Sequence, residues 1–196
     1  RKEGLEPFSL RACLKTKAPT MNISVIQGSP RSGSNSAKIA QFLCDELNAK
    51  EGVRATVISL RELDFPNFDT GRDIPQIPMM RAALTDADGL LFVFPEYNGG
   101  MPGAMKNALD YFRPEYDLKP MAAVTVSSGP FGGLNAWHAF HSWAMYVGGI
   151  LLPNNLKVSG AGNLFDESGN PSEEHFNLNY PKFLDQFQWL VAKIKS

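Results

Sequence analysis

Short continuous apolar runs alternate along this chain with segments whose apolar residues recur every three or four positions. The continuous runs predict buried strands, and the helical spacing predicts amphipathic helices. Strands are expected at 22–27, 53–60, 90–94, 121–126 and 150–152, the last of which 156–158 could extend. Helices are expected from 36 onward, at 79–88, at 105–112, at 135–147 and at 173–194, with an interruption of the last near Pro181. Loops are expected at 64–78 and 165–172.

Strands that alternate with helices indicate an α/β fold with a parallel sheet. Because the crossovers are right-handed, the helices should cover both faces of a doubly wound sheet of five strands. Three polar or glycine-rich loops each follow an expected strand, at 28–36, 95–103 and 127–133. Ligands of open α/β sheets bind outside the carboxyl ends of the strands, so the three loops should meet at one cleft.

The first of these loops has the character of a phosphate site. It carries glycine, hydroxyl and basic side chains directly before a helix, and Asn35 and Ser36 are residue types favoured at a helix start. Unpaired N–H groups and the helix dipole at such a start attract anions. The side chains that add hydrogen-bond donors or charge are Ser29, Arg31, Ser34 and Ser36. The alternative is an ordinary strand-to-helix turn with normal capping.

The spacing of the glycines limits which phosphate this loop could bind. Gly28 and Gly33 have the spacing of a nucleoside-triphosphate loop, but Ser34 stands where that motif requires lysine. A nucleotide hydrolase is therefore disfavoured. The dinucleotide pattern is absent too, since Ser29 and Pro30 follow Gly28. What remains suits one terminal monophosphate, as on a mononucleotide cofactor.

The second loop, 95–103, suits contact with a planar ring. Asn98 and Gly99 allow backbone conformations that bring the chain close to a ligand, and Pro95 and Tyr97 offer flat apolar surface. The alternative is a plain turn before a helix. The third loop could line the far side of the same ligand or admit a second one.

Composition narrows the class of protein. The chain has 196 residues, 43% hydrophobic and 20% charged, with a formal net charge of −1, which implies no general attraction to nucleic acid or to an anionic membrane. No apolar run approaches the roughly 18–20 residues that span a bilayer. Cys13 and Cys44 share no motif, so a reducing cytoplasm is the expected compartment and Cys44 is expected in the core.

Two further segments allow more than one interpretation. Residues 1–20 are basic, while 21–196 carry a net charge of −4, so we treat 1–20 as an extension or remnant that could pack on a partner subunit, and 21–196 as one domain. His138 and His141 could begin a metal site, but no completing ligand is near in sequence, so we expect no metal. Packing among Trp137 and its aromatic neighbours, or a subunit interface, is the alternative.

The three loops carry a resemblance to a known family. The strings 28–36, 95–110 and 129–133 resemble those of the NAD(P)H-dependent FMN reductases, which have a flavodoxin-like fold and include quinone, azo-dye and chromate reductases. The similarity runs over about 22–190. It implies bound FMN, transient NADH or NADPH, and a homodimer or homotetramer with the site near an interface.

The resemblance also assigns roles to residues. It implies that the FMN phosphate is held by Ser29, Arg31, Ser34, Asn35 and Ser36. It implies that the isoalloxazine ring meets Pro95, Glu96, Tyr97, Asn98 and Gly99, largely through backbone atoms, and that Ser127 and Ser128 lie near the ring or the ribityl chain. We assign no catalytic side chain, because flavin N5 carries the chemistry.

The expected activity follows from these roles. Hydride would pass from the nicotinamide to the flavin, and then to a quinone-like, azo, chromate or free-flavin acceptor, in a ping-pong order. A rival interpretation is a flavodoxin-like electron carrier or redox-signalling module that binds FMN without nicotinamide turnover. The net charge of −4 over 21–196 argues mildly against a carrier, since simple carriers are more acidic.

Overall fold

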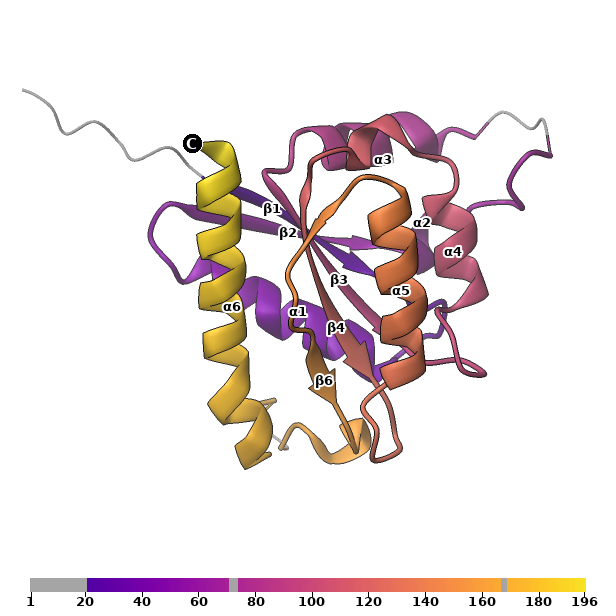
Figure 1. The fold of residues 1–196 in the computed structure, drawn as a ribbon. Helices are drawn as coiled ribbons and strands as arrows, with labels where there is room; N and C mark the ends of the chain where they lie inside the picture. Colours follow the sequence, from indigo (N-terminus) through magenta and orange to yellow (C-terminus); the bar gives the residue numbers. More distant parts are fainter. Residues whose placement is uncertain (1–20, 71–73, 167–168) are drawn as a thin grey trace, which may run out of the picture.

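A computed structural model of the chain describes residues 21–70, 74–166 and 169–196. A parallel sheet runs through the centre of these residues, with helices on both faces (Figure 1). The strands are β1 (Met21–Gln27), β2 (Val53–Ser59), β3 (Gly89–Pro95), β4 (Pro120–Val126), β5 (Ile150–Leu151) and β6 (Leu156–Val158). The helices are α1 (Asn35–Asn48), α2 (Leu60–Leu63), α3 (Gln76–Thr85), α4 (Gly103–Leu109), α5 (Leu134–Tyr146) and α6 (Glu174–Lys195), with 3₁₀ turns η1 (Pro114–Tyr116) and η2 (Ala161–Asn163). The expected α/β fold is confirmed.

The sheet follows the order β2-β1-β3-β4-β5. At its far edge β4 pairs with two short strands in turn, because Pro120 and Met121 face β5 while Val124–Val126 face β6. The fifth expected strand is therefore present in two pieces. Pro153 lies between them and cannot donate a ladder hydrogen bond, which accounts for the break.

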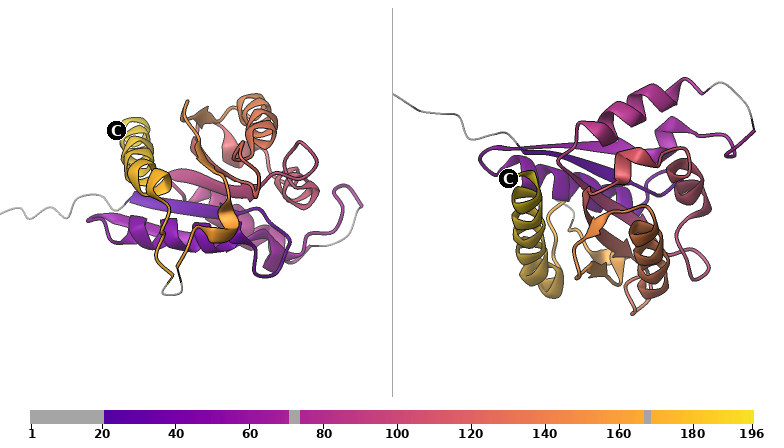
Figure 2. Two further views of the ribbon diagram at one scale, coloured as in Figure 1. Left: turned by 90° about the horizontal axis from the view of Figure 1, so that it is seen from below. Right: turned by 45° about the horizontal axis from the view of Figure 1, so that its top comes forward.

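Two hydrophobic layers hold the helices to the sheet. On one face α1 and α6 pack against it through residues such as Leu43 and Phe187. On the other face α3, α4 and α5 pack through residues such as Met80, Met105 and Phe140. Figure 2 shows these helices on opposite sides of the strands. Every residue of β4 is buried, and so is all of β3 except Pro95, so the central strands read as continuous apolar runs.

The segment between β2 and β3 differs most from the sequence prediction. The short helix α2 was not expected, and α3 begins at Gln76 rather than at Met79. Pro78 suggested a loop, but it lies in the first turn of α3, where its missing N–H group would have no partner within the helix.

The expected interruption of the C-terminal helix near Pro181 is wrong, because α6 continues through it. An internal proline costs a helix about 3 kcal/mol. Phe176 and Phe183, on either side of Pro181, are both buried in the core. Their burial, at about 1.5–3 kcal/mol for each fully buried side chain, holds the helix in place across the missing hydrogen bond.

Other expectations have mixed outcomes. Cys44 lies in the core as expected, and burial, together with the neighbouring Asp45, raises the pKa of its thiol. Trp137, Phe140 and Trp143 also lie in the core, so these three side chains pack mainly within the protein. Residues 1–20, where an extension was expected, lie outside the described residues. Among the residues described, no helix combines the length and the apolar character needed to cross a membrane.

Candidate functional site

A cavity of about 210 Å³ lies where β1, β3 and β4 end at the same edge of the sheet. The three loops predicted to converge do meet here, because each contributes to its wall. The cavity is lined by Ser29, Arg31, Gly33, Ser34, Asn35, Ser36, Pro95, Glu96, Tyr97, Val126, Ser127, Ser128 and Ala161. Ten of the twelve side chains that sequence reasoning selected are thus brought together.

Hydroxyl groups form the wall that comes from the first loop. Ser29, Ser34 and Ser36 are 1%, 7% and 1% exposed. Ser34, not Asn35 or Ser36, is the N-cap of α1, and its Oγ accepts a hydrogen bond from the Ala37 N–H at 3.2 Å. Ser36 Oγ lies 3.2 Å from Ser34 Oγ. The helix therefore begins one residue earlier than expected, and its first turn opens onto the cavity.

Gln27, which sequence reasoning missed, supports this wall from below. It is 3% exposed at the end of β1. Its Nε2 donates to the Ser29 carbonyl at 3.1 Å and approaches Ser34 Oγ at 3.5 Å, while its Oε1 accepts from Ser59 Oγ at 3.2 Å. The one feature of the sequence that could have identified Gln27 is that it is a single polar residue at the end of an apolar strand. Through these hydrogen bonds Gln27 connects the first loop, at Ser29 and Ser34, to the sheet.

The second loop is a tight hairpin. Tyr97 and Gly100 exchange two backbone hydrogen bonds of 3.0 Å, and the two residues between them, Asn98 and Gly99, have φ values of 47° and 76°. This is the geometry of a two-residue type I′ turn, for which Asn-Gly is the preferred sequence. Asn98 and Gly99 lie at the tip, outside the cavity lining. The Tyr97 hydroxyl reaches back to 3.4 Å from Ser29 Oγ, which joins the second loop to the first.

The carboxylate of Glu96 is bound to the start of α5. Its Oε2 accepts hydrogen bonds from the Asn135 N–H at 2.9 Å and the Ala136 N–H at 3.2 Å, and its Oε1 accepts from Asn135 Nδ2 at 3.3 Å. Glu96 therefore supplies the acceptor at the start of α5 and complements the helix dipole there. This geometry leaves Glu96 in the wall without giving it the role of a general base.

The third loop is held at its base by Thr125. Thr125 Oγ1 donates to the Gly132 carbonyl at 2.6 Å and accepts from Asn155 Nδ2 at 3.0 Å. The Ser127 N–H donates to the Val158 carbonyl at 2.9 Å, and Ser127 Oγ accepts from the Gly129 N–H at 2.9 Å. These bonds position Ser127 and Ser128 against the cavity.

Three residues that line the cavity were not among those selected from the sequence. Gly33 lies in the expected first loop and Val126 in an expected strand, but neither residue was expected to line the cavity. Ala161 belongs to η2, which is brought in by β6, and its N–H donates to the Ser127 carbonyl at 3.2 Å. Small apolar residues of this kind gain a role only through the fold.

The donor set fits the phosphate monoester end of FMN. Three buried hydroxyls, the opening turn of α1 and the basic residue Arg31 all line the cavity, and we call this wall its phosphate end. Gly28 lets the loop pass close to the sheet, since a Cβ atom there would lie 2.4 Å from Met105 Sδ and 3.0 Å from Phe94 Cβ. With the carboxylate of Glu96 bound to α5, the phosphate end is lined by donors and a cation.

His138 and His141 both lie exposed on α5. The ring of His141 is in edge contact with Trp137, at 5.7 Å between centroids. Among the described residues, no three His, Cys, Asp or Glu side chains come together as a metal-binding group. The expectation that these histidines pack among the core aromatics is wrong for His138, which contacts solvent instead.

Comparisons with known sequences show which proteins this chain resembles. The sequence profile of the family described as NADPH-dependent FMN reductase matches residues 21–163. A quinone reductase of Pseudomonas putida is 30% identical over 161 residues, which are 78% of this chain and 86% of the relative. An NADPH azoreductase of Bacillus sp. (strain OY1-2) is 29% identical over 142 residues, 71% of this chain and 78% of the relative.

Solved structures show the same fold. FerB of Paracoccus denitrificans, described as a flavoenzyme NAD(P)H:(acceptor) oxidoreductase, superposes with a TM-score of 0.76 at 23% identity, covering 88% of this chain and 98% of FerB. Flavodoxin 1 of Bacillus cereus superposes with a TM-score of 0.55 at 16% identity, covering 85% of this chain and 96% of the flavodoxin. The fold is therefore flavodoxin-like.

Proposed function

Because this chain belongs to the NADPH-dependent FMN reductase family, we propose that residues 21–196 form one FMN-binding unit, which takes hydride from NADH or NADPH and reduces a second substrate. As a member of that family the chain is an oxidoreductase. The observation that carries the proposal is the cavity itself. A donor-lined end suited to a phosphate monoester lies next to a hairpin suited to a planar ring, joined by the 3.4 Å contact between Tyr97 and Ser29.

Each wall has a proposed role toward FMN. Ser29, Arg31, Ser34, Asn35 and Ser36 would hold the phosphate, with Gln27 fixing the loop beneath them. Around the isoalloxazine ring we place Pro95, Glu96, Tyr97, Asn98 and Gly99, and Ser127 and Ser128. FMN, when bound, supplies the two-electron chemistry at N5. The hairpin would read the ring edge through backbone groups, since Asn98 and Gly99 leave that backbone uncrowded.

The proposed reaction balances without a catalytic side chain. NAD(P)H and one proton from solvent would become NAD(P)⁺ as a quinone becomes a hydroquinone. The residues that line the cavity would hold the FMN ring so that the nicotinamide can approach it in a near-attack geometry. The chain's contribution is to hold the ring, keep one face open and let the two substrates use it in turn. Quinones, azo compounds, chromate and free flavins are the acceptor classes we propose.

Steady-state turnover tests this function. Under anaerobic conditions we expect the FMN-loaded protein to oxidise more than one equivalent of NADPH or NADH per flavin only when a quinone such as naphthoquinone is present, followed as loss of the reduced nicotinamide absorbance. Parallel initial-rate lines at several quinone concentrations would support a ping-pong order. If FMN binds but neither nicotinamide is oxidised with a quinone, an azo dye or chromate, the protein is an electron carrier and the reductase proposal fails.

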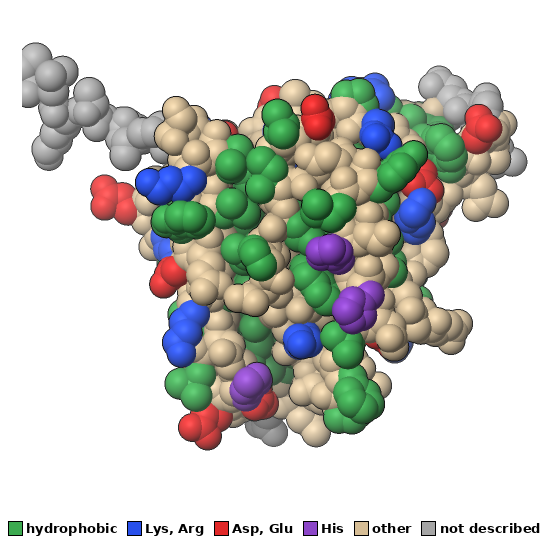
Figure 3. Space-filling model, in the orientation of Figure 1, with side chains coloured by type: hydrophobic (Ala, Val, Ile, Leu, Met, Phe, Trp, Pro, Cys, Tyr) green, Lys and Arg blue, Asp and Glu red, His purple; other side chains and the backbone are tan. Residues whose placement is uncertain are grey.

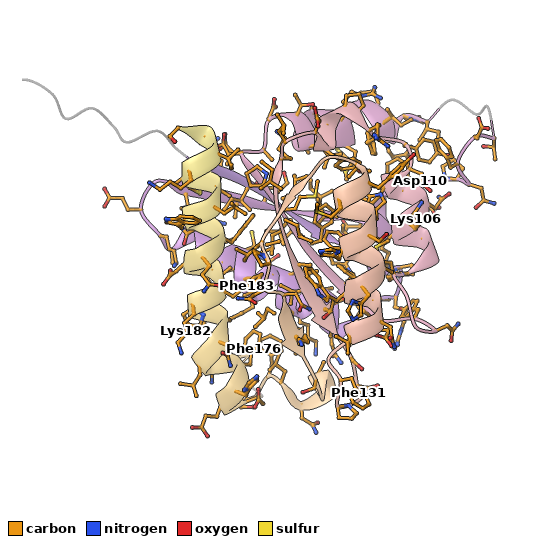
Figure 4. The ribbon with its side chains drawn as sticks, viewed as in Figure 1. Lys106, Asp110, Phe131, Phe176, Lys182 and Phe183 are labelled. Carbon is orange, nitrogen blue, oxygen red and sulfur yellow. The ribbon has the colours of Figure 1, made fainter. Side chains whose placement is uncertain are left out.

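We also propose that the protein assembles as a homodimer or homotetramer through the groove between α4 and α5. This groove, of about 600 Å³, has apolar walls that include Met101, Trp143 and Val147. Lys106 and Asp110, paired at 2.6 Å on α4, lie at its side (Figure 4). A second copy related by a two-fold axis would present the same ion pair in the opposite direction, which is self-complementary.

The groove adjoins the cofactor cavity, because Met101 belongs to the second loop. Exposed Tyr146, under the Arg113 guanidinium at 4.7 Å, extends the apolar surface. Sedimentation of the FMN-loaded protein should give two or four times the 21.6 kDa chain mass, and Tyr146→Glu should lower that mass. A wild-type protein that sediments as a monomer at micromolar concentration would contradict this assembly.

A further inference from the structure

One large aromatic side chain of the third loop has no part in the function proposed above. Phe131, in the third loop between β4 and α5, is 77% exposed. Figure 4 shows it at the lower end of the molecule, close to the end of β6 and the start of α5. A single exposed aromatic residue is common on protein surfaces. Phe131 differs because the backbone on both sides of it is fixed.

The fixation comes from hydrogen bonds and close packing. Before Phe131, the Gly129 N–H donates to Ser127 Oγ at 2.9 Å. After it, the Gly132 carbonyl accepts from Thr125 Oγ1 at 2.6 Å. Gly132 and Gly133 have φ values of 58° and 79°, and a Cβ atom at either would lie within 2.9 Å of a side chain beneath it. The backbone that carries the Phe131 ring is therefore held in one position on both sides of it.

The third loop places Phe131 near residues that line the cavity. Ser127 and Ser128 line the cavity, and Phe131 follows Ser128 by three residues along the same loop. The wall across the cavity comes from Pro95 and Tyr97. We therefore expect the planar ring of an acceptor to reach the cofactor between the hairpin and the third loop. β6 ends beside Val126, which lines the cavity, and Phe131 lies exposed near that end of β6, so it is at the end of the sheet that carries the cavity.

We propose that Phe131 is a specificity-determining residue, whose ring packs against the planar ring of a quinone-type acceptor above the cofactor. This inference rests on the proposed function and narrows its acceptor class. Aromatic rings attract one another in offset-stacked or edge-to-face arrangements, so a quinone gains from the contact. A small octahedral metal-cyanide ion has no ring to stack and gains nothing. Phe131 thus favours planar aromatic acceptors over small inorganic ones.

The oxidative half-reaction isolates this contact from nicotinamide binding. FMN-loaded protein is reduced with dithionite and mixed anaerobically with either naphthoquinone or ferricyanide, while flavin absorbance is followed. For Phe131→Ala we expect the second-order rate constant with naphthoquinone to fall by about tenfold, since stacking and apolar contact are both lost. We expect the ferricyanide rate constant and the FMN content to stay at the wild-type level. Phe131→Tyr, which keeps the ring, should restore the quinone rate.

Trp189→Ala is the matched control, because Trp189 is an exposed aromatic residue, 61% accessible, on α6 rather than in the loop. It should change neither rate constant. An unchanged naphthoquinone rate constant in Phe131→Ala would overturn the inference, and so would an equal loss with both oxidants, which would indicate an altered cofactor. A wild-type protein that does not bind FMN would remove the proposed function and this inference together. A protein that reacts with quinone but not with nicotinamide would overturn the reductase proposal alone.

Discussion

Replacing Arg31 by alanine is expected to raise the dissociation constant for FMN by about 10- to 100-fold, because a charge-assisted hydrogen bond is worth about 1.5–3 kcal/mol. Arg31 lines the phosphate end of the cavity. Its backbone N–H donates a hydrogen bond to Ser29 Oγ at 3.3 Å, which fixes the backbone that carries the guanidinium. The other donors at this end, Ser29, Ser34 and Ser36, are neutral. The guanidinium is thus the only cation among the residues that line this cavity.

Quenching of FMN fluorescence measures this effect. Arg31→Lys keeps the charge but loses the fork of donors, so its dissociation constant should fall between those of the wild type and Arg31→Ala. Arg54→Ala is the matched control, because Arg54 is exposed on β2 and does not line the cofactor cavity. Equal FMN affinity in Arg31→Ala and in Arg54→Ala would remove Arg31 from the phosphate site.

Replacing Gln27 by leucine should weaken both the fold and FMN binding. Leucine nearly matches the volume of glutamine, but it removes the acceptor of the half-buried Ser59 hydroxyl and a donor to the buried Ser34 hydroxyl. Leaving a buried polar group unsatisfied costs about 1–3 kcal/mol. The first loop would also lose its tie to the sheet through the Ser29 carbonyl. We expect FMN affinity to fall by about tenfold, as a positioning effect equivalent to about 1.4 kcal/mol.

Urea unfolding and FMN titration of the same preparations separate the two effects. Gln41→Leu is the matched control, since Gln41 is exposed on α1 and bonds only to Asp45 Oδ1, at 2.8 Å. That variant should lose no more than a few tenths of a kcal/mol. If Gln27→Leu unfolds at the wild-type urea concentration and binds FMN as well as the wild type, Gln27 does not support the loop.

Local patterns were sufficient to predict the sheet and its edge. β3 and β4 are buried on both faces, so their sequences are unbroken apolar runs that stand out from the rest. The carboxyl ends of parallel strands must lie together, so three separate loops could be assigned to one cleft. The convergence of Ser29, Tyr97 and Ser127 follows from that rule alone.

What the sequence could not supply depends on contacts between distant segments. The sequence around Glu96 gives no sign that its carboxylate binds the first N–H groups of α5, which lie 39 and 40 residues further along the chain. Pro181 breaks an isolated helix, but Phe176 and Phe183 hold α6 to the sheet on both sides of it. Gln27 and Ala161 act through partners far along the chain or through backbone atoms, which leave no local pattern.

The charge on the protein surface contributes little to selectivity among substrates. Figure 3 shows basic and acidic side chains interspersed among hydrophobic ones on the face it displays. With a net charge of −1, long-range attraction of an anionic substrate is weak. Selection among acceptors should therefore depend on short-range contacts at the cavity, where the third loop presents an aromatic ring.

The absorption spectrum of the purified protein, after incubation with FMN and removal of free flavin, decides whether the cavity binds FMN. We expect a yellow protein with about one FMN per chain, whose flavin bands disappear under anaerobic NADPH or NADH. A protein that emerges colourless, and stays colourless after every attempt to load it with FMN, would contradict the account.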